Sequence, residues 1–160
     1  MTELDTDITP TAALLDEETQ LRLSTIDERT CFDIGSTIAQ RSADEGLATT
    51  IGVYLHDRLV YKAAFAGTTS DNDLVIAAKR NVAQLDGHSS LYARNRYLEA
   101  GTSFEKATGK QFPEYAPYGG AVPLRTVDDQ VLGYVVVSGL TQEEDHRLAV
   151  EAIRAAQQNA

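Results

Sequence analysis

The chain has 160 residues, which suits one domain that buries roughly two thirds of its unfolded surface without disulfides or metal. Its 14 basic and 24 acidic residues give a net charge of −10, which argues against sequence-blind nucleic-acid binding and against anchoring on an anionic membrane. Cys31, the single cysteine, excludes an internal disulfide and a cysteine-rich metal site. With no signal-peptide pattern and no apolar run near the ~20 residues of a transmembrane helix, we expect a cytoplasmic protein.

The charge is unevenly distributed along the chain. Residues 1–30 hold eight acidic and two basic residues, and residues 1–11 are predicted to form a disordered acidic tail before a single domain over residues 12–157. Residues 79–110 hold six basic and three acidic residues, a local balance of +3. An anionic ligand would bind at this segment, unless its charges simply solvate a helix face.

Hydrophobic spacing and turn residues predict the order of helices and strands. In chain order, we predict helices over residues 11–23 and 30–45, strands over 50–56 and 59–65, a helix over 70–100, strands over 121–127 and 131–138, and a helix over 141–157. The stretch from residue 113 to 120 is predicted to be irregular.

Several residues mark where the helices begin and end. Asp27 or Thr30 could cap the second helix, and Gly46 ends it because glycine tolerates a positive φ. The segments Ser70–Asp73 and Thr141–Glu144 both have the spacing of a capping box. We therefore expect the third and fourth helices to begin there.

The strands form two hairpins separated by a long helix. Asp57 and Arg58 have the spacing of a two-residue turn in the first hairpin. The second contains the continuously apolar run Val135–Val137, which predicts a central strand covered on both faces. This order predicts an α+β domain, an antiparallel sheet with helices on its faces, and excludes a doubly wound nucleotide-binding fold.

The sequence patterns of several common enzyme classes are missing. There is no Gly-x-Ser-x-Gly elbow, no phosphate-binding loop and no dinucleotide fingerprint. His56, His88 and His146 do not lie four residues from one another. His146 follows acidic residues at a helix start, which either stabilise the helix dipole or belong to a metal site. Cys31 is expected to be a buried, unreactive thiol.

The long helix carries the first candidate ligand-binding residues. If it is straight, Lys79, Arg80, Gly87 and Arg94 lie on one side of it. Glycine inside a helix costs roughly 1 kcal/mol relative to alanine, so Gly87 indicates either a close approach of another group or a bend. Cations beside a bare Cα suit a flat or anionic ligand, or the backbone of another subunit.

Tyr118, Gly119 and Gly120 form the second candidate group. Paired glycines at the start of a strand let another backbone come close, and a tyrosine supplies an apolar plate with a hydroxyl tip. This combination predicts the lip of a pocket or a contact between subunits. The alternative is ordinary packing.

Five segments together resemble a known family. Gly67–Asp73, Lys79–Asn81, Gly87–Ser90, Gly119–Pro123 and Ser138–His146 occur in this order. They resemble small bacterial and fungal proteins known as heme-degrading domain proteins, which are grouped with the GlcG-like and HbpS-like proteins. The resemblance spans about residues 15–155. It implies a profilin-like antiparallel sheet of four to five strands and assembly into homo-oligomers.

The resemblance also implies binding, or degradation, of haem or a related small anionic ligand. Lys79, Arg80 and Arg94 would then engage carboxylates such as the propionates, and His88 or Tyr118 would be the candidate ligand of the haem iron. Many relatives carry histidine at the position of Tyr118, so this chain offers a different donor there. Turnover would be oxidative haem cleavage with an external reductant.

Two further hypotheses stay open. In the first, the protein is a non-enzymatic oligomeric scaffold without a haem role, in which the same segments hold subunits together and partner proteins dock on the acidic surface. In the second, it is a hydrolase or isomerase that uses His88 with a carboxylate. The sequence leaves open whether the protein is an enzyme.

Overall fold

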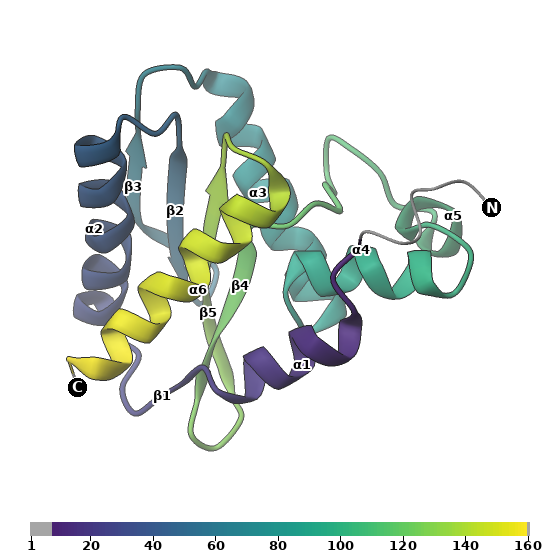
Figure 1. The fold of residues 1–160 in the computed structure, drawn as a ribbon, viewed down its shortest axis with the longest axis horizontal. Helices are drawn as coiled ribbons and strands as arrows, with labels where there is room; N and C mark the ends of the chain where they lie inside the picture. The colour runs from purple at the N-terminus through teal and green to yellow at the C-terminus, as the bar shows by residue number, and fades with distance from the viewer. Residues whose placement is uncertain (1–7, 160) are drawn as a thin grey trace.

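The computed structural model describes residues 8–159 (Figure 1). Most of the predicted disordered tail, residues 1–7, lies outside the described residues. The residues that follow contact a later helix: Asn95 Nδ2 donates to Thr9 O at 2.9 Å, and Thr11 N donates to Glu99 Oε1 at 2.9 Å. The start of the described chain is therefore docked on the domain.

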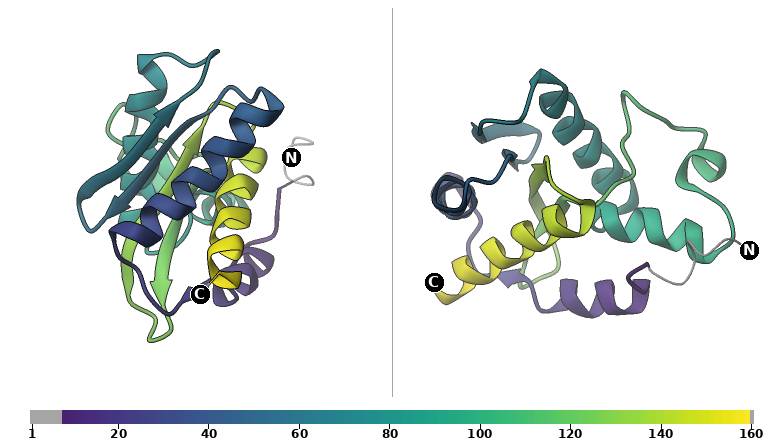
Figure 2. Two further views of the ribbon diagram at one scale, coloured as in Figure 1. Left: turned by 90° about the vertical axis from the view of Figure 1, so that its left-hand side faces the viewer. Right: turned by 45° about the horizontal axis from the view of Figure 1, so that its top comes forward.

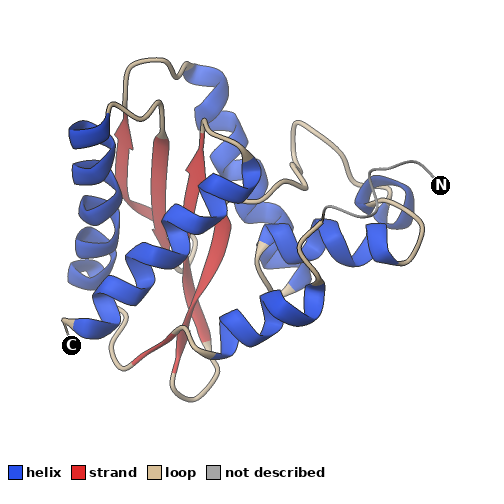
Figure 3. Cartoon of the chain, in the orientation of Figure 1, coloured by secondary structure: helices blue, strands red, loops and turns tan. Residues whose placement is uncertain are grey.

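The described chain contains helices and strands in mixed order (Figure 3). They are α1 (Thr11–Thr19), β1 (Arg22–Leu23), α2 (Glu28–Glu45), β2 (Thr50–Leu55), β3 (Arg58–Ala64), α3 (Ser70–Asp86), α4 (Ser90–Glu99), α5 (Phe104–Thr108), β4 (Ala121–Thr126), β5 (Val131–Ser138) and α6 (Gln142–Gln158). None of the helices in the described part of the chain is long and apolar enough to span a bilayer.

The five strands form one sheet in the order β1-β4-β5-β2-β3, so β5 is central, as its apolar run predicted. β2 pairs antiparallel with β3 and β5, and β4 pairs antiparallel with β5. β1 pairs parallel with β4, which makes the sheet mixed. The sequence assigned these two residues to the first helix, and this was wrong because a two-residue strand is too short to show alternation. The predicted α+β fold is otherwise confirmed.

Helices cover both faces of the sheet (Figure 2). α2 and α6 pack side by side on one face, and α3 packs on the other. Alternate strand residues divide accordingly: Val135 and Val137 belong to the core under α2 and α6, whereas Val136 packs with Ile76 of α3. Because neighbouring side chains of a strand point to opposite faces, a strand covered on both sides must be apolar throughout.

The predicted long helix over residues 70–100 is broken in two. α3 ends at Asp86, Gly87 adopts φ 80°, and Ser89 caps α4 by accepting from Tyr92 N. A Cβ added at Gly87 would meet nothing within 4 Å, so this glycine serves the left-handed turn and not a close approach. The bend that the sequence offered as an alternative is confirmed, and the straight helix is wrong.

Most of the remaining boundaries agree with the sequence within a residue or two, but α1 ends at Thr19, four residues before its predicted end, and α5 was not predicted. Asp27 caps α2, Gly46 ends it in the left-handed conformation, and the capping box of Thr141–Glu144 opens α6. The cap of α3 is Thr69 rather than Ser70. The first hairpin turns at His56, which has φ 55°, one residue before the predicted turn, because the strands pair Leu55 with Arg58.

Candidate functional site

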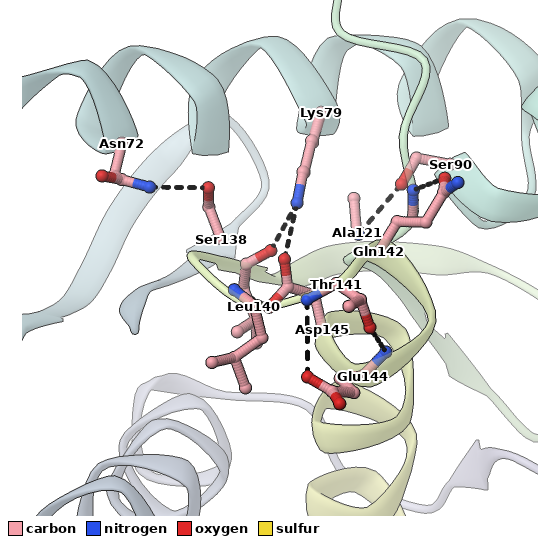
Figure 4. A network of polar contacts seen from close by, with 12 residues as sticks. Asn72, Lys79, Ser90, Ala121, Ser138, Leu140, Thr141, Gln142, Glu144 and Asp145 are labelled. Atoms are coloured by element: carbon pink, nitrogen blue, oxygen red, sulfur yellow. Dashed lines mark hydrogen bonds and ion pairs between the residues drawn. The ribbon is translucent and has the colours of Figure 1, made fainter. Parts of the chain in front are cut away.

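A hollow of about 400 Å³ lies where α3, the end of β5 and the start of α6 meet. Its floor contains Lys79 and Asp145. Its walls include the following side chains: Asn72, Val75, Tyr118, Ser138, Leu140 and Gln142. Three of the five segments that carried the family resemblance line this hollow, namely Gly67–Asp73, Lys79–Asn81 and Ser138–His146, and Figure 4 shows the region from close by.

A buried ion pair forms the floor of the hollow. Lys79 reaches from α3 toward the start of α6, and its Nζ donates to Asp145 Oδ2 at 3.1 Å and to Val137 O at 2.9 Å (Figure 4). Lys79 is 3% exposed and Asp145 1%. Lys79, which the sequence placed in a basic ligand-binding segment, is therefore an interior residue, and the Asp145 carboxylate already balances its charge.

Burial shifts both groups toward their neutral forms. It lowers the pKa of Lys79 below the ordinary 10.5, and the nearby Asp145 carboxylate offsets part of that shift. It raises the pKa of Asp145 above the ordinary 3.8, which Lys79 opposes. Because burial removes both groups from water, the charged forms of Lys79 and Asp145 are less favourable here than they would be on the surface.

The start of α6 fixes the position of the carboxylate. Asp145 Oδ1 accepts from Leu140 N at 3.1 Å, and Asp145 N donates to Thr141 O at 2.8 Å in the first helical turn. These bonds hold the acid on the rigid end of a capped helix. The bond to Leu140 spans only five residues and directs Oδ1 of Asp145 toward the loop before α6. The other carboxylate oxygen, Oδ2, accepts from Lys79.

Amide and hydroxyl side chains link the walls of the hollow. Asn72 Nδ2 donates to Ser138 Oγ at 3.1 Å, which joins the start of α3 to the end of β5. Gly119 N donates to Gln142 Oε1 at 3.1 Å, which joins the segment before β4 to α6. Tyr118 lies at the rim and is 53% exposed, as expected for a pocket lip.

The paired glycines pack against the protein's own chain. A Cβ on Gly119 would lie 2.6 Å from Gln142 O, and one on Gly120, whose φ is 139°, would collide with Val137 O and lie 2.9 Å from Lys79 Nζ. Both glycines are buried: Gln142 of α6 and Leu91 of α4 cover Gly119, and Val137 of β5 and Lys79 cover Gly120. The close approach that the sequence predicted therefore occurs within the protein itself.

A second polar cluster surrounds His88, in the link between α3 and α4. His88 Nδ1 lies 2.7 Å from Glu18 Oε2, and the other carboxylate oxygen of Glu18 accepts from Ser89 N at 2.6 Å. The Glu18 side chain is nearly fully buried, while that of His88 is 35% exposed. The Tyr92 ring lies against the imidazole, with 4.6 Å between ring centroids.

Asp86 and Arg96 extend this cluster. Arg96 Nε lies 3.0 Å from Asp86 Oδ1, and the Asp86 side chain is buried. Burial raises the pKa of Asp86, while Arg96 and His88 act in the opposite direction. Asp86 Oδ2 is a buried oxygen without a hydrogen-bond partner. The cluster therefore combines two buried carboxylates with a half-exposed imidazole.

The other predicted residues lie elsewhere. The Arg80 guanidinium lies 4.8 Å from the centroid of the Tyr54 ring and 3.6 Å from Asp57 Oδ1, and Arg80 does not line the hollow. Arg94 Nη1 donates to Asn95 Oδ1 at 2.9 Å. The structure thus brings together Lys79, Tyr118 and the two glycines, but it separates them from Arg80, Arg94 and His88.

Cys31 and His146 are both buried. Cys31 is buried as expected, and burial raises its pKa to about 11; its lack of reactivity stays a prediction. His146 Nε2 lies 2.6 Å from Glu17 Oε1. Within residues 8–159, no group of three or more His, Cys, Asp and Glu side chains could hold a metal ion, so the metal site considered at His146 is not formed.

Sequence reasoning missed the acidic partners of both clusters. Asp145 and Glu18 are 66 and 70 residues from Lys79 and His88, so no local spacing could pair them. Asp145 lies inside a segment that carried the family resemblance, which is the only signal that pointed to it. Glu18 belongs to the acidic N-terminal region and had no such signal.

These features define a small α+β domain with a polar hollow beside the central strand. A family model described as "Haem degrading protein HbpS-like" matches residues 26–154, and the chain belongs to this family. It is 34% identical over 145 residues to the UPF0303 protein SCO2848 of Streptomyces coelicolor, covering 90% of this chain and 92% of that protein. A UPF0303 protein of Psychromonas ingrahamii is 30% identical, covering 88% of each chain.

Solved structures share the fold. The crystal structure of the Ybr137w protein has a TM-score of 0.86 and 29% identity, covering 95% of this chain and 90% of that chain. A crystal structure of HbpS has a TM-score of 0.65 and 14% identity, covering 84% and 91%. A crystal structure of a PduOC:heme complex has a TM-score of 0.69 and 13% identity, covering 83% and 95%. At these lower identities the likeness concerns the fold alone.

Proposed function

We propose that this protein is a homo-oligomeric protein that binds haem or a closely related small anionic ligand through His88. The family description names haem, and one structure with the same fold is a haem complex. When bound, haem would supply a redox-active iron. Oxidative cleavage would need an external reductant, because the chain carries no flavin or nicotinamide fingerprint.

The observation that carries this proposal is the contact between His88 Nδ1 and Glu18 Oε2 at 2.7 Å. A carboxylate that accepts the proton of one ring nitrogen fixes the tautomer and leaves the other nitrogen as a lone-pair donor. Metal-ligating histidines commonly have such a partner, which also raises the basicity of the ligand. The His88 side chain is 35% exposed, so part of the imidazole faces solvent.

Tyr118 is the weaker of the two candidate iron ligands. A phenol must lose its proton before it can bind iron, whereas an imidazole that donates one ring proton to a carboxylate keeps a lone pair on its other nitrogen. Tyr118 also belongs to the rim of the hollow, away from the Glu18 contact. We therefore assign the ligand role to His88.

The carboxylates of the ligand need free cations. Lys79 is excluded because its ammonium is buried against Asp145, and Arg80 is held over Tyr54. Arg94 and Arg96 lie on α4, which begins two residues after His88. Arg96 is already paired with the buried Asp86 carboxylate, whereas Arg94 bonds the neutral amide of Asn95, so Arg94 is the proposed carboxylate partner.

The test is a titration of the purified protein with ferric haem, followed at the Soret band and by light scattering. We expect saturable binding that is lost in His88→Ala and kept in Tyr118→Phe. His56→Asn, a change at another histidine in an exposed turn, is the matched control and should bind normally. A weak, non-saturating shift that is equal in all four proteins would contradict the proposal.

An assembly role without haem is the second candidate function. Leu74 and Leu85 lie about three turns apart on α3, so they share one face of the helix. They are 56% and 49% exposed. The two exposed leucines offer apolar surface on one helix face that a second subunit would cover. If the haem titration fails while Leu74→Glu with Leu85→Glu reduces the mass in solution, the scaffold function is the better account.

A further inference from the structure

The hollow over Lys79 has a feature that the proposed haem function does not use. A primary amine that is 3% exposed lines an open space of about 400 Å³, and an equally buried carboxylate lies 3.1 Å from it. A lysine that served only as a surface cation would not be placed there, because burying its charge is costly.

We propose that Lys79 forms an imine with a small, uncharged aldehyde or ketone that binds in this hollow. The site does not involve His88, so this inference goes beyond the proposed haem function and stands or falls separately from it.

The chemistry follows from the two groups on the floor. The neutral Nζ adds its electron pair to the carbonyl carbon, the C=O π electrons move to oxygen, and one proton passes from the nitrogen to that oxygen, which gives a carbinolamine. The carboxyl of Asp145 gives its proton to the departing hydroxyl, which leaves as water, and the carboxylate takes back the proton released by nitrogen as the C=N bond forms. One imine and one water result, and no electron donor or acceptor is needed.

The electrostatics of the floor favour this step. Burial lowers the pKa of Lys79 and raises that of Asp145, so a larger fraction of the amine is neutral and a larger fraction of the acid is protonated than in water. Lysines that act as nucleophiles are commonly desolvated in this way. The carbonyl of Val137, 2.9 Å from Nζ, orients the amine.

The walls indicate the class of carbonyl compound. Among the residues that line the hollow, Lys79 carries the only positive charge, and Asp145 balances it. A carboxylate on the substrate would therefore find no free cation there. Val75 and Leu140 offer apolar contacts, and Asn72 and Gln142 offer amides, which suits a short, uncharged molecule with one or two polar groups.

The alternative is that the ion pair only ties α3 to α6. The two accounts differ in the reactivity of the wild-type protein. At pH 6.5 an exposed lysine is almost entirely protonated, and each unit by which a pKa is lowered raises the neutral fraction about tenfold. Lys79 should then react faster than the exposed Lys62 and Lys106, although it is buried.

The experiment treats the wild-type protein with propanal and cyanoborohydride at pH 6.5 and maps the alkylated lysines by mass spectrometry. We expect Lys79 to be modified faster than Lys62 and Lys106, because burial lowers the pKa of Lys79 and so raises its neutral fraction. Leu140→Trp, which fills the hollow, should slow labelling at Lys79 and leave Lys62 unchanged; circular dichroism checks that the variant is folded.

Labelling of Lys62 and Lys106 with Lys79 unmodified, or modified only in urea, would overturn the proposal and leave the ion pair as a structural link. Equal labelling of Lys79 in Leu140→Trp would also overturn it, because the reagent would not then act through the hollow. The labelling experiment contains no haem, so its result tests the imine proposal independently of whether the haem titration succeeds or fails.

Discussion

Replacing Lys79 by methionine tests how the protein tolerates the buried ion pair. The lysine and aspartate side chains are 4% and 2% exposed, so solvent does not screen them. Lys79→Met leaves the Asp145 carboxylate buried without its partner, which costs about 3–5 kcal/mol. A domain of this size is stable by about 5–15 kcal/mol, so this change removes a large share of its stability. Lys62→Met is the matched control, because its pair with Asp73 is exposed and is worth at most ~1 kcal/mol.

The assay is urea unfolding at pH 7, followed by circular dichroism and tyrosine fluorescence. Lys79→Met with Asp145→Asn should recover much of the loss, because the amide is uncharged and still accepts from Leu140 N. The loss in Lys79→Met should shrink on acidification. Burial raises the folded pKa of Asp145 above its ordinary 3.8, so the protonated acid restores stability at low pH and the penalty returns as pH rises through the raised value. A loss below ~1 kcal/mol, or no recovery in the double variant, would refute this account.

Three further predictions concern single positions. Gly120→Ala should destabilise the protein by more than the ~1–2 kcal/mol cost of an alanine with positive φ, because the new Cβ also collides with Val137 O. Gly101→Ala is the control: Gly101 has φ 79° and open space around it, so this variant should show only the conformational cost in the same unfolding assay. Thr141→Ala should lower the stability by about 1 kcal/mol, since its side chain caps α6, and an unchanged urea midpoint would contradict the cap. Cys31 should resist a thiol reagent at pH 8 in the native protein and react fully in urea; fast native labelling would contradict a buried thiol of pKa about 11.

The fold was largely predictable because its signals are local. The spacing of apolar residues, the capping box at Thr141 and the glycine after α2 depend on neighbours in the chain. The continuous apolar run of β5 indicated its central position, because only a strand covered on both faces can be apolar on both. β1 escaped prediction because two residues paired to a distant strand carry no periodic signal.

The sites were less predictable because they depend on long-range contacts. Lys79 was grouped with Arg80 and Arg94 by helical spacing, yet the chain breaks at Gly87, and Lys79 turns inward to Asp145. Helical spacing gave no sign that Lys79 is buried, because its partner Asp145 lies 66 residues away in the sequence. The glycine pair was identified, but the groups that approach it are Val137, Gln142 and Lys79 of the same chain.

The most direct test of the central claim is the resonance Raman spectrum of the ferrous haem complex of the wild-type protein. The account predicts an iron–histidine stretching band that disappears in His88→Ala. In Glu18→Gln the band should move to lower frequency, because the amide no longer strengthens the imidazole as a donor, and haem affinity should fall by about 10–100-fold. A complex with no iron–histidine band, or with a band that both substitutions leave unchanged, would contradict the claim that His88 binds haem.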